Sequence, residues 1–79
     1  MPLNQRDVKN QIITALPENE QRDAVLSESR ATGGYFIITD FRVFEIYTAG
    51  GDVYVQVRNF GNDGWDSVDV TGDTELDLS

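Results

Sequence analysis

The sequence contains no cysteine and no histidine, and Lys9 is its only lysine. Without cysteine there is neither a disulfide framework nor a thiolate zinc site, and the commonest transition-metal ligand is missing without histidine. Neither residue type is available as a base or nucleophile near neutral pH, and a single lysine leaves little scope for Schiff-base or phosphate-loop chemistry. These absences predict a protein that is not an enzyme and that holds no metal and no cofactor.

Long apolar runs are also absent, and none approaches the about 20 residues of a membrane-spanning helix. The polar start, Met1–Lys9, does not have the pattern of a signal peptide. We therefore expect a cytoplasmic protein without a membrane partner. The net charge of −8 argues against direct binding of nucleic acid or anionic lipid, because phosphate binding needs cations. With 79 residues, of which 39% are apolar, the chain predicts one folded domain with a thin core.

Positive charge is missing from the whole C-terminal end. Arg58 is the last base, so residues 59–79 carry −6 of the net charge and residues 1–58 carry only −2. The six acids of this end are Asp63, Asp66, Asp69, Asp73, Glu75 and Asp77. A bare acidic surface of this kind predicts a protein partner with a basic surface.

The N-terminal part has the pattern of an amphipathic helix. Asn4 is a candidate N-cap, and apolar residues recur at helical spacing from Val8 to Leu16. Pro17 disfavours helical geometry at the residue before it, so we predict a helix over 5–16. Residues 17–30 fit a short second helix that begins at Pro17, or alternatively a short strand over 24–28.

From Tyr35 onward, β-branched and aromatic residues dominate and glycines separate the apolar runs. We predict strands over 35–39, 42–48, 53–60, 65–70 and 74–78. The expected fold class is α+β, with one or two N-terminal helices packed on a four- to five-stranded antiparallel meander. The whole chain, 1–79, forms one domain with a helical part at 4–30 and a β-meander at 35–78.

The hairpin around Gly50 and Gly51 also predicts a register. Two consecutive glycines permit the positive φ angles of a tight turn. Centring the turn on them places one apolar face toward the core, with the pairs Thr48–Val53, Ile46–Val55 and Phe44–Val57. The opposite face then pairs Val43, Glu45 and Tyr47 with Arg58, Gln56 and Tyr54.

The first candidate site is the acidic hairpin formed by the last two predicted strands. Asp69, Glu75 and Asp77 fall on odd positions, whereas the apolar residues fall on even ones, so one face presents an array of carboxylates. Like charges across strands destabilise a sheet unless a partner neutralises them. The array fits imitation of a nucleic-acid backbone, or alternatively a solvated edge that provides solubility and discourages aggregation.

Aromatic residues form the second candidate site. Tyr47 and Tyr54 are predicted neighbours on the more polar face beside Glu45, where they fit either an interface anchor or a stabilising cross-strand pair. We expect Trp65 to pack against the small core. The segment 62–66 supplies oxygen ligands but does not match an EF-hand loop, so we interpret it as a turn and predict no metal there.

One stretch has a local resemblance to a known family. Residues 34–44 resemble the hairpin of bacterial pleckstrin-homology-like and GRAM-type domains, in which a hydrophobic strand ends in Leu-Thr-Asp/Asn-x-Arg. Here Thr39, Asp40 and Arg42 match that turn. The resemblance supports a turn over 39–42 and implies a scaffold or membrane-proximal adaptor. Family members are longer and end in a helix, where this chain has acidic strands.

Together these observations predict a small acidic protein-binding module. In size, charge and lack of catalytic groups the chain resembles small phage-encoded inhibitors, including anti-CRISPR proteins and other DNA mimics. The hypothesis is an inhibitor whose acidic hairpin, with Tyr47 and Tyr54, occupies a basic nucleic-acid-binding surface of its partner. The alternative is a structural or adaptor module of a larger assembly. Neither the partner nor the oligomeric state follows from the sequence.

Overall fold

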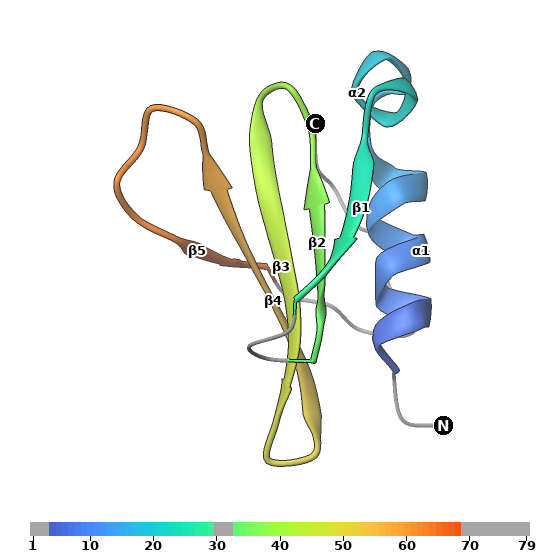
Figure 1. Cartoon of the computed structure of the whole chain (residues 1–79), viewed down its shortest axis with the longest axis vertical. Helices are drawn as coiled ribbons and strands as arrows, with labels where there is room; N and C mark the ends of the chain where they lie inside the picture. Colours follow the sequence, from blue (N-terminus) through green and yellow to red (C-terminus); the bar gives the residue numbers. More distant parts are fainter. Residues whose placement is uncertain (1–3, 30–32, 69–79) are drawn as a thin grey trace.

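The part of the protein that the structure describes folds into two helices and one five-stranded antiparallel sheet (Figure 1). A computed structural model describes residues 4–29 and 33–68. The strands lie side by side in chain order, so each pairs with the one before it. This arrangement confirms the predicted α+β class. The elements are α1 (Gln5–Ala15), α2 (Glu18–Arg22), β1 (Val25–Glu28), β2 (Tyr35–Ile38), β3 (Arg42–Ala49), β4 (Asp52–Asn59) and β5 (Asp66–Val68).

The first helix begins at the predicted residue and ends at Ala15, one residue before the predicted end. The side chain of Asn4 accepts a hydrogen bond of 2.8 Å from the backbone N–H of Asp7, which is the expected N-cap. Leu16 adopts an extended conformation at the C-cap, because the following Pro17 excludes helical geometry there. The apolar stripe of α1 is buried, with Val8 and Ile12 fully inaccessible to solvent.

Residues 17–30 contain both predicted alternatives, a short helix and then a short strand. Pro17 is the N-cap rather than the first residue of α2, which begins at Glu18. The chain then forms β1, the edge strand of the sheet, inside the segment that was assigned to the helical part. The apolar run of this strand was too short to show a period, so its state is decided by its pairing with β2.

The predicted register of the central hairpin is confirmed. Phe44 pairs with Val57, Ile46 with Val55 and Thr48 with Val53. Gly50 and Gly51 form the two-residue turn with φ angles of 59° and 87°, which residues with a side chain rarely adopt. Of the two C-terminal strands that we predicted, 65–70 corresponds to β5, and 74–78 lies outside the described residues.

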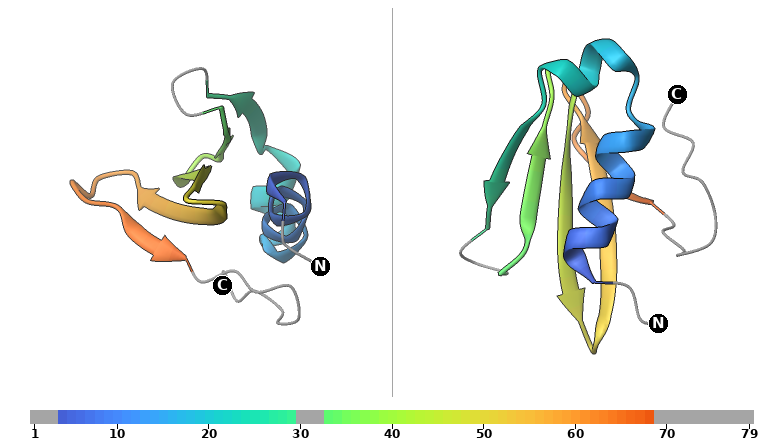
Figure 2. Two further views of the ribbon diagram at one scale, coloured as in Figure 1. Left: turned by 90° about the horizontal axis from the view of Figure 1, so that it is seen from below. Right: turned by 90° about the vertical axis from the view of Figure 1, so that its right-hand side faces the viewer.

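The core lies between α1 and one face of the sheet. Val8, Ile12 and Leu16 of the helix pack against four buried strand residues, which are Ile37, Phe44, Ile46 and Val55. Figure 2 shows that α1 covers one side of the sheet, where it packs against β2 and β3. A fully buried apolar side chain stabilises a fold by about 1.5–3 kcal/mol, so this thin core supplies much of the driving force for folding.

Candidate functional site

The face of the sheet that points away from α1 is the candidate site, and we call it the open face. Its members follow from the pairing, because residues opposite each other in a ladder share a face and neighbours along a strand alternate. They are Val25, Ser27, Phe36, Ile38, Val43, Glu45, Tyr47, Ala49, Asp52, Tyr54, Gln56, Arg58 and Ser67. No helix within 4–29 or 33–68 covers this side (Figure 2).

Large apolar side chains on the open face remain in contact with solvent. Val25, Ile38 and Val43 occupy one row across three neighbouring strands, and the first two are 59% and 37% exposed. Phe36 lies in the next row, opposite Glu45, and is half-buried. Cross-strand neighbours are about 4.8 Å apart, so these residues form a continuous apolar surface rather than isolated exposed positions.

The two tyrosines lie on the open face, as predicted. Tyr47 and Tyr54 are direct cross-strand partners, and their rings stack with centroids 5.7 Å apart and planes inclined by 26°. Tyr54 keeps 46% of its surface exposed. Beside them, Gln56 donates a hydrogen bond of 2.5 Å to the Glu45 carboxylate. Stacking fixes both rings in advance, which lowers the conformational entropy that a partner must overcome to use them.

A second group of exposed aromatic residues lies at one end of the sheet, which we call the loop end. Phe41 follows β2 and Phe60 follows β4, and a backbone hydrogen bond of 2.9 Å from the Phe60 N–H to the Phe41 carbonyl joins them. They are 58% and 55% exposed. Trp65 directly precedes β5 and is 41% exposed, which corrects the expectation that it packs against the core. The β4–β5 loop, to which Trp65 belongs, lies on the other side of the molecule from α1 (Figure 1).

The structure describes two of the six C-terminal acids, and neither lies beside the tyrosines. Asp63 is exposed in the β4–β5 loop, whereas Tyr54 lies near the start of β4, about 17 Å or more away along the strand. Asp66 pairs with Val57 and therefore belongs to the helix side of the sheet, not to the open face. Asp69, Asp73, Glu75 and Asp77 lie outside the described residues. Of the predicted acids within residues 4–29 and 33–68, Glu45 is the one that shares the open face with the tyrosines.

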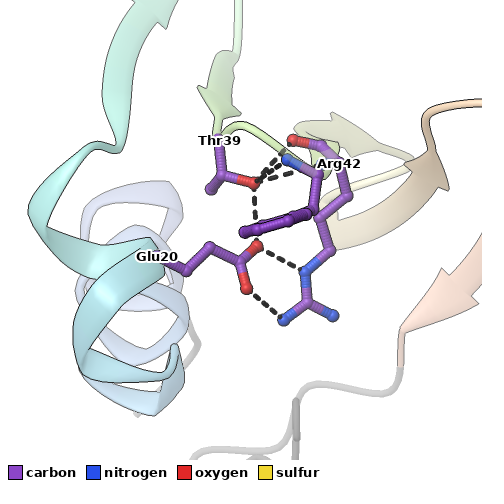
Figure 3. Close-up of polar contacts among 4 residues, drawn as sticks. Glu20, Thr39 and Arg42 are labelled. Carbon is purple, nitrogen blue, oxygen red and sulfur yellow. Dashed lines mark hydrogen bonds and ion pairs between the residues drawn. The ribbon is translucent and has the colours of Figure 1, made fainter.

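A buried polar cluster fixes the loop end (Figure 3). The Glu20 carboxylate accepts hydrogen bonds from Arg42 Nε at 2.7 Å, Arg42 Nη2 at 3.0 Å and the Thr39 hydroxyl at 2.8 Å. The same hydroxyl oxygen accepts from the backbone N–H groups of Phe41 and Arg42, which closes the turn. These contacts tie α2 to the β2–β3 turn and so position Phe41.

The cluster holds Glu20 in its ionised form. Burial raises the pKa of the Glu20 carboxyl, but the Arg42 guanidinium and the Thr39 hydroxyl together outweigh this effect and leave the pKa below its ordinary value. The carboxylate is therefore fully bonded and unavailable as an acid or base. Its role is structural, although it is the most strongly buried charge in the part of the chain that the structure describes.

Sequence reasoning found the tyrosine pair but missed two parts of this arrangement. The turn over 39–42 was predicted, and Thr39 and Arg42 were recognised in it, but nothing nearby in the sequence marks Glu20 as their partner. The exposed row of Val25, Ile38 and Val43 was also missed. Its only signal is that β2 is apolar at every position, which is typical of a strand with both faces covered.

In residues 4–29 and 33–68 no group of three or more acidic side chains has an arrangement suited to a metal ion. None of the helices in these ranges is long and apolar enough to cross a bilayer. No protein family, curated protein sequence or solved structure matches this chain.

Proposed function

We propose that this protein is a small acidic protein-binding module that docks on a basic surface of its partner through the open face. The observation that carries the proposal is the apolar row formed by Val25, Ile38 and Val43, which no helix within the described residues covers. A contiguous exposed apolar surface on a small protein commonly marks a site of protein contact. The stacked tyrosines, two rows away on the same face, supply a residue type that often dominates binding energy.

The dimensions of the sheet limit the contact area that the open face can provide. Five strands about 4.8 Å apart and at most eight residues long give a flat footprint of at most about 500 Å². A standard interface covers about 800 Å² on each partner. The loop end, with Phe41, Phe60 and Trp65, supplies the additional contact area. We therefore expect these three aromatic side chains to be buried together with the open face.

The negative charge of the protein indicates that its partner has a basic surface. The whole chain carries a net charge of −8, and Arg58 is the one base on the open face within the described ranges. Its guanidinium already donates to the Asn62 carbonyl at 2.9 Å. Glu45 on the open face and Asp63 in the β4–β5 loop remain to attract Lys and Arg side chains. The finer proposal is that the partner uses its basic surface to bind nucleic acid, so that occupation inhibits it.

Site-specific photocrosslinking followed by reconstitution tests this proposal. A benzophenone side chain replaces Tyr54 on the open face or, as the matched control, Thr14 on the exposed side of α1. Proteins joined only through position 54 are then purified and their affinity for the unmodified chain is measured. We expect Tyr47→Ser with Tyr54→Ser to weaken binding at least tenfold, since anchor residues cost more than about 1 kcal/mol each. Failure to form any adduct specific to position 54 would count against the open face.

Binding measurements on the reconstituted complex distinguish an inhibitor from an adaptor module. For an inhibitor, affinity falls as salt rises, nucleic acid competes, and the combined change Asp69→Asn, Glu75→Gln and Asp77→Asn abolishes binding, because ion pairs carry the contact. For an adaptor module, binding survives both the salt and the neutralised variant. Binding that is unchanged from low to high salt would refute the electrostatic part of the proposal and leave the apolar part standing.

A further inference from the structure

We infer that the free edge of β1 is a second binding site, which accepts an extended basic segment of another protein as a sixth antiparallel strand. Among the strands in residues 4–29 and 33–68, β1 is the outermost and pairs with β2 alone (Figure 1). All four of its residues are exposed. This edge is distinct from the open face, so the inference does not depend on the proposed function.

The direction of the backbone groups along β1 follows from the hairpin that joins it to β2. The Ser29 N–H donates to the Gly34 carbonyl at 2.8 Å, and the Ser29 carbonyl accepts from the Gly33 N–H at 2.9 Å, so both groups of Ser29 face β2. Inward and outward residues alternate along an antiparallel strand. Leu26 and Glu28 therefore direct their N–H and C=O groups away from the sheet, where they offer two consecutive pairing positions to another strand.

Native proteins commonly protect an exposed edge strand with proline, lysine, a bulge, a covering segment, a short length or an inward-pointing charge. Strand β1 has the last two, because it is four residues long and carries Glu28 on the helix side, and a basic segment that pairs with Glu28 would neutralise that charge. The strand Val25-Leu26-Ser27-Glu28 contains neither proline nor lysine, and its pairing with β2 is continuous over all four residues, without a bulge. Helix α1 packs on β2 and β3 and leaves Leu26, on the helix side of β1, 46% exposed.

The side chains of β1 define the segment that would fit. Leu26 and Glu28 share the helix side, because they pair with Ile37 and Tyr35. A strand added along this edge places one side chain opposite each of them. An apolar residue fits beside Leu26, and a Lys or Arg two positions away fits beside Glu28. A second copy of this chain is a poorer occupant, because two molecules of charge −8 repel each other.

A symmetric heptapeptide provides the probe. The acetylated and amidated peptide Thr-Lys-Thr-Val-Thr-Lys-Thr places valine beside Leu26 and lysine beside Glu28. Titration to about 5 mM, followed by amide chemical shifts in NMR spectra, detects affinities in the millimolar range. We expect the largest shifts at the Leu26 and Glu28 amides. The same peptide with glutamate in place of lysine should bind about two- to fivefold more weakly, since the exposed ion pair is lost.

Two variants at Leu26 test whether the edge of β1 is responsible for peptide binding. Leu26→Pro removes an outward N–H without removing a ladder bond to β2, so the fold should persist while binding is lost. Leu26→Ala is the matched control, because it shortens the side chain but keeps the N–H and therefore retains binding. In Glu28→Lys the preference should reverse, so that the glutamate peptide binds more tightly. Tyr54→Ser, on the open face, should leave peptide binding unchanged.

Several results would overturn the inference. One is the absence of shifts at Leu26 and Glu28 throughout the titration, and another is equal binding by the Leu26→Pro and Leu26→Ala variants. A third is a dimer of the unmodified protein, seen by light scattering, that Leu26→Pro converts to monomer. That result would show that a second copy of this chain occupies the edge instead.

Discussion

The ion pair between Glu20 and Arg42 joins α2 to the β2–β3 turn, and its removal provides the sharpest test of the fold. Replacing Glu20 with alanine deletes an acceptor of three hydrogen bonds, two from Arg42 and one from the Thr39 hydroxyl. Loss of one partner from a buried ion pair typically costs about 3–5 kcal/mol, because the other charge stays buried without compensation. Arg42 is 17% exposed and regains part of its hydration, so we expect a loss of about 2–3 kcal/mol.

This loss is large for a domain of 79 residues, whose total stability is expected to be about 4–12 kcal/mol. Each kcal/mol shifts the melting temperature of a domain of this size by about 4–8 °C, so Glu20→Ala should lower it by about 8–24 °C. Urea and thermal unfolding followed by far-ultraviolet circular dichroism measure both quantities. Glu18→Ala is the matched control, since Glu18 is exposed on the same short helix.

The pH dependence of stability separates the charge of Glu20 from its packing. Because the pKa of the Glu20 carboxyl is lowered in the folded state, its contribution is fully present above the ordinary pKa of 4.5 and is lost as the pH falls through the folded-state value. The difference in stability between the natural protein and Glu20→Gln should therefore shrink below pH 4.5. A difference that is independent of pH, or a Glu20→Ala variant as stable as Glu18→Ala at pH 7, would refute this account.

Three further predictions concern the scaffold of the site. A Cβ atom added at Gly34 would lie 1.8 Å from the Ile46 carbonyl oxygen, so Gly34→Ala should destabilise the sheet by about 2 kcal/mol or more in urea unfolding, and an unchanged midpoint would contradict this close approach. Asn4→Ala should cost about 1 kcal/mol through loss of the N-cap, whereas Asn4→Ser should cost much less. A double-mutant cycle on Tyr47 and Tyr54 should give a coupling of about 0.5–1.5 kcal/mol, and a value near zero would show that the stacked rings do not interact energetically.

The elements that the sequence predicted well are those whose determinants are local. Asn4 and Pro17 bracket α1, because capping and the restriction before proline act within a few residues. The glycine pair at 50–51 fixes the central hairpin, and the alternation of apolar residues around it permits only one register that buries an apolar face. The placement of Tyr47 beside Tyr54 follows directly from that register.

Other features depend on contacts between distant segments, and only the tertiary structure decided them. The four residues of β1 form a strand because they pair with β2, and their own pattern of apolar residues does not predict it. Glu20 is buried because it meets Arg42, which lies 22 positions away in the chain. The open face is exposed because α1 packs on the opposite side of the sheet and no helix within the described residues packs on this one (Figure 2). The exposure of a strand side chain therefore depends on which elements pack on its face of the sheet, and the sequence of a single strand does not determine this.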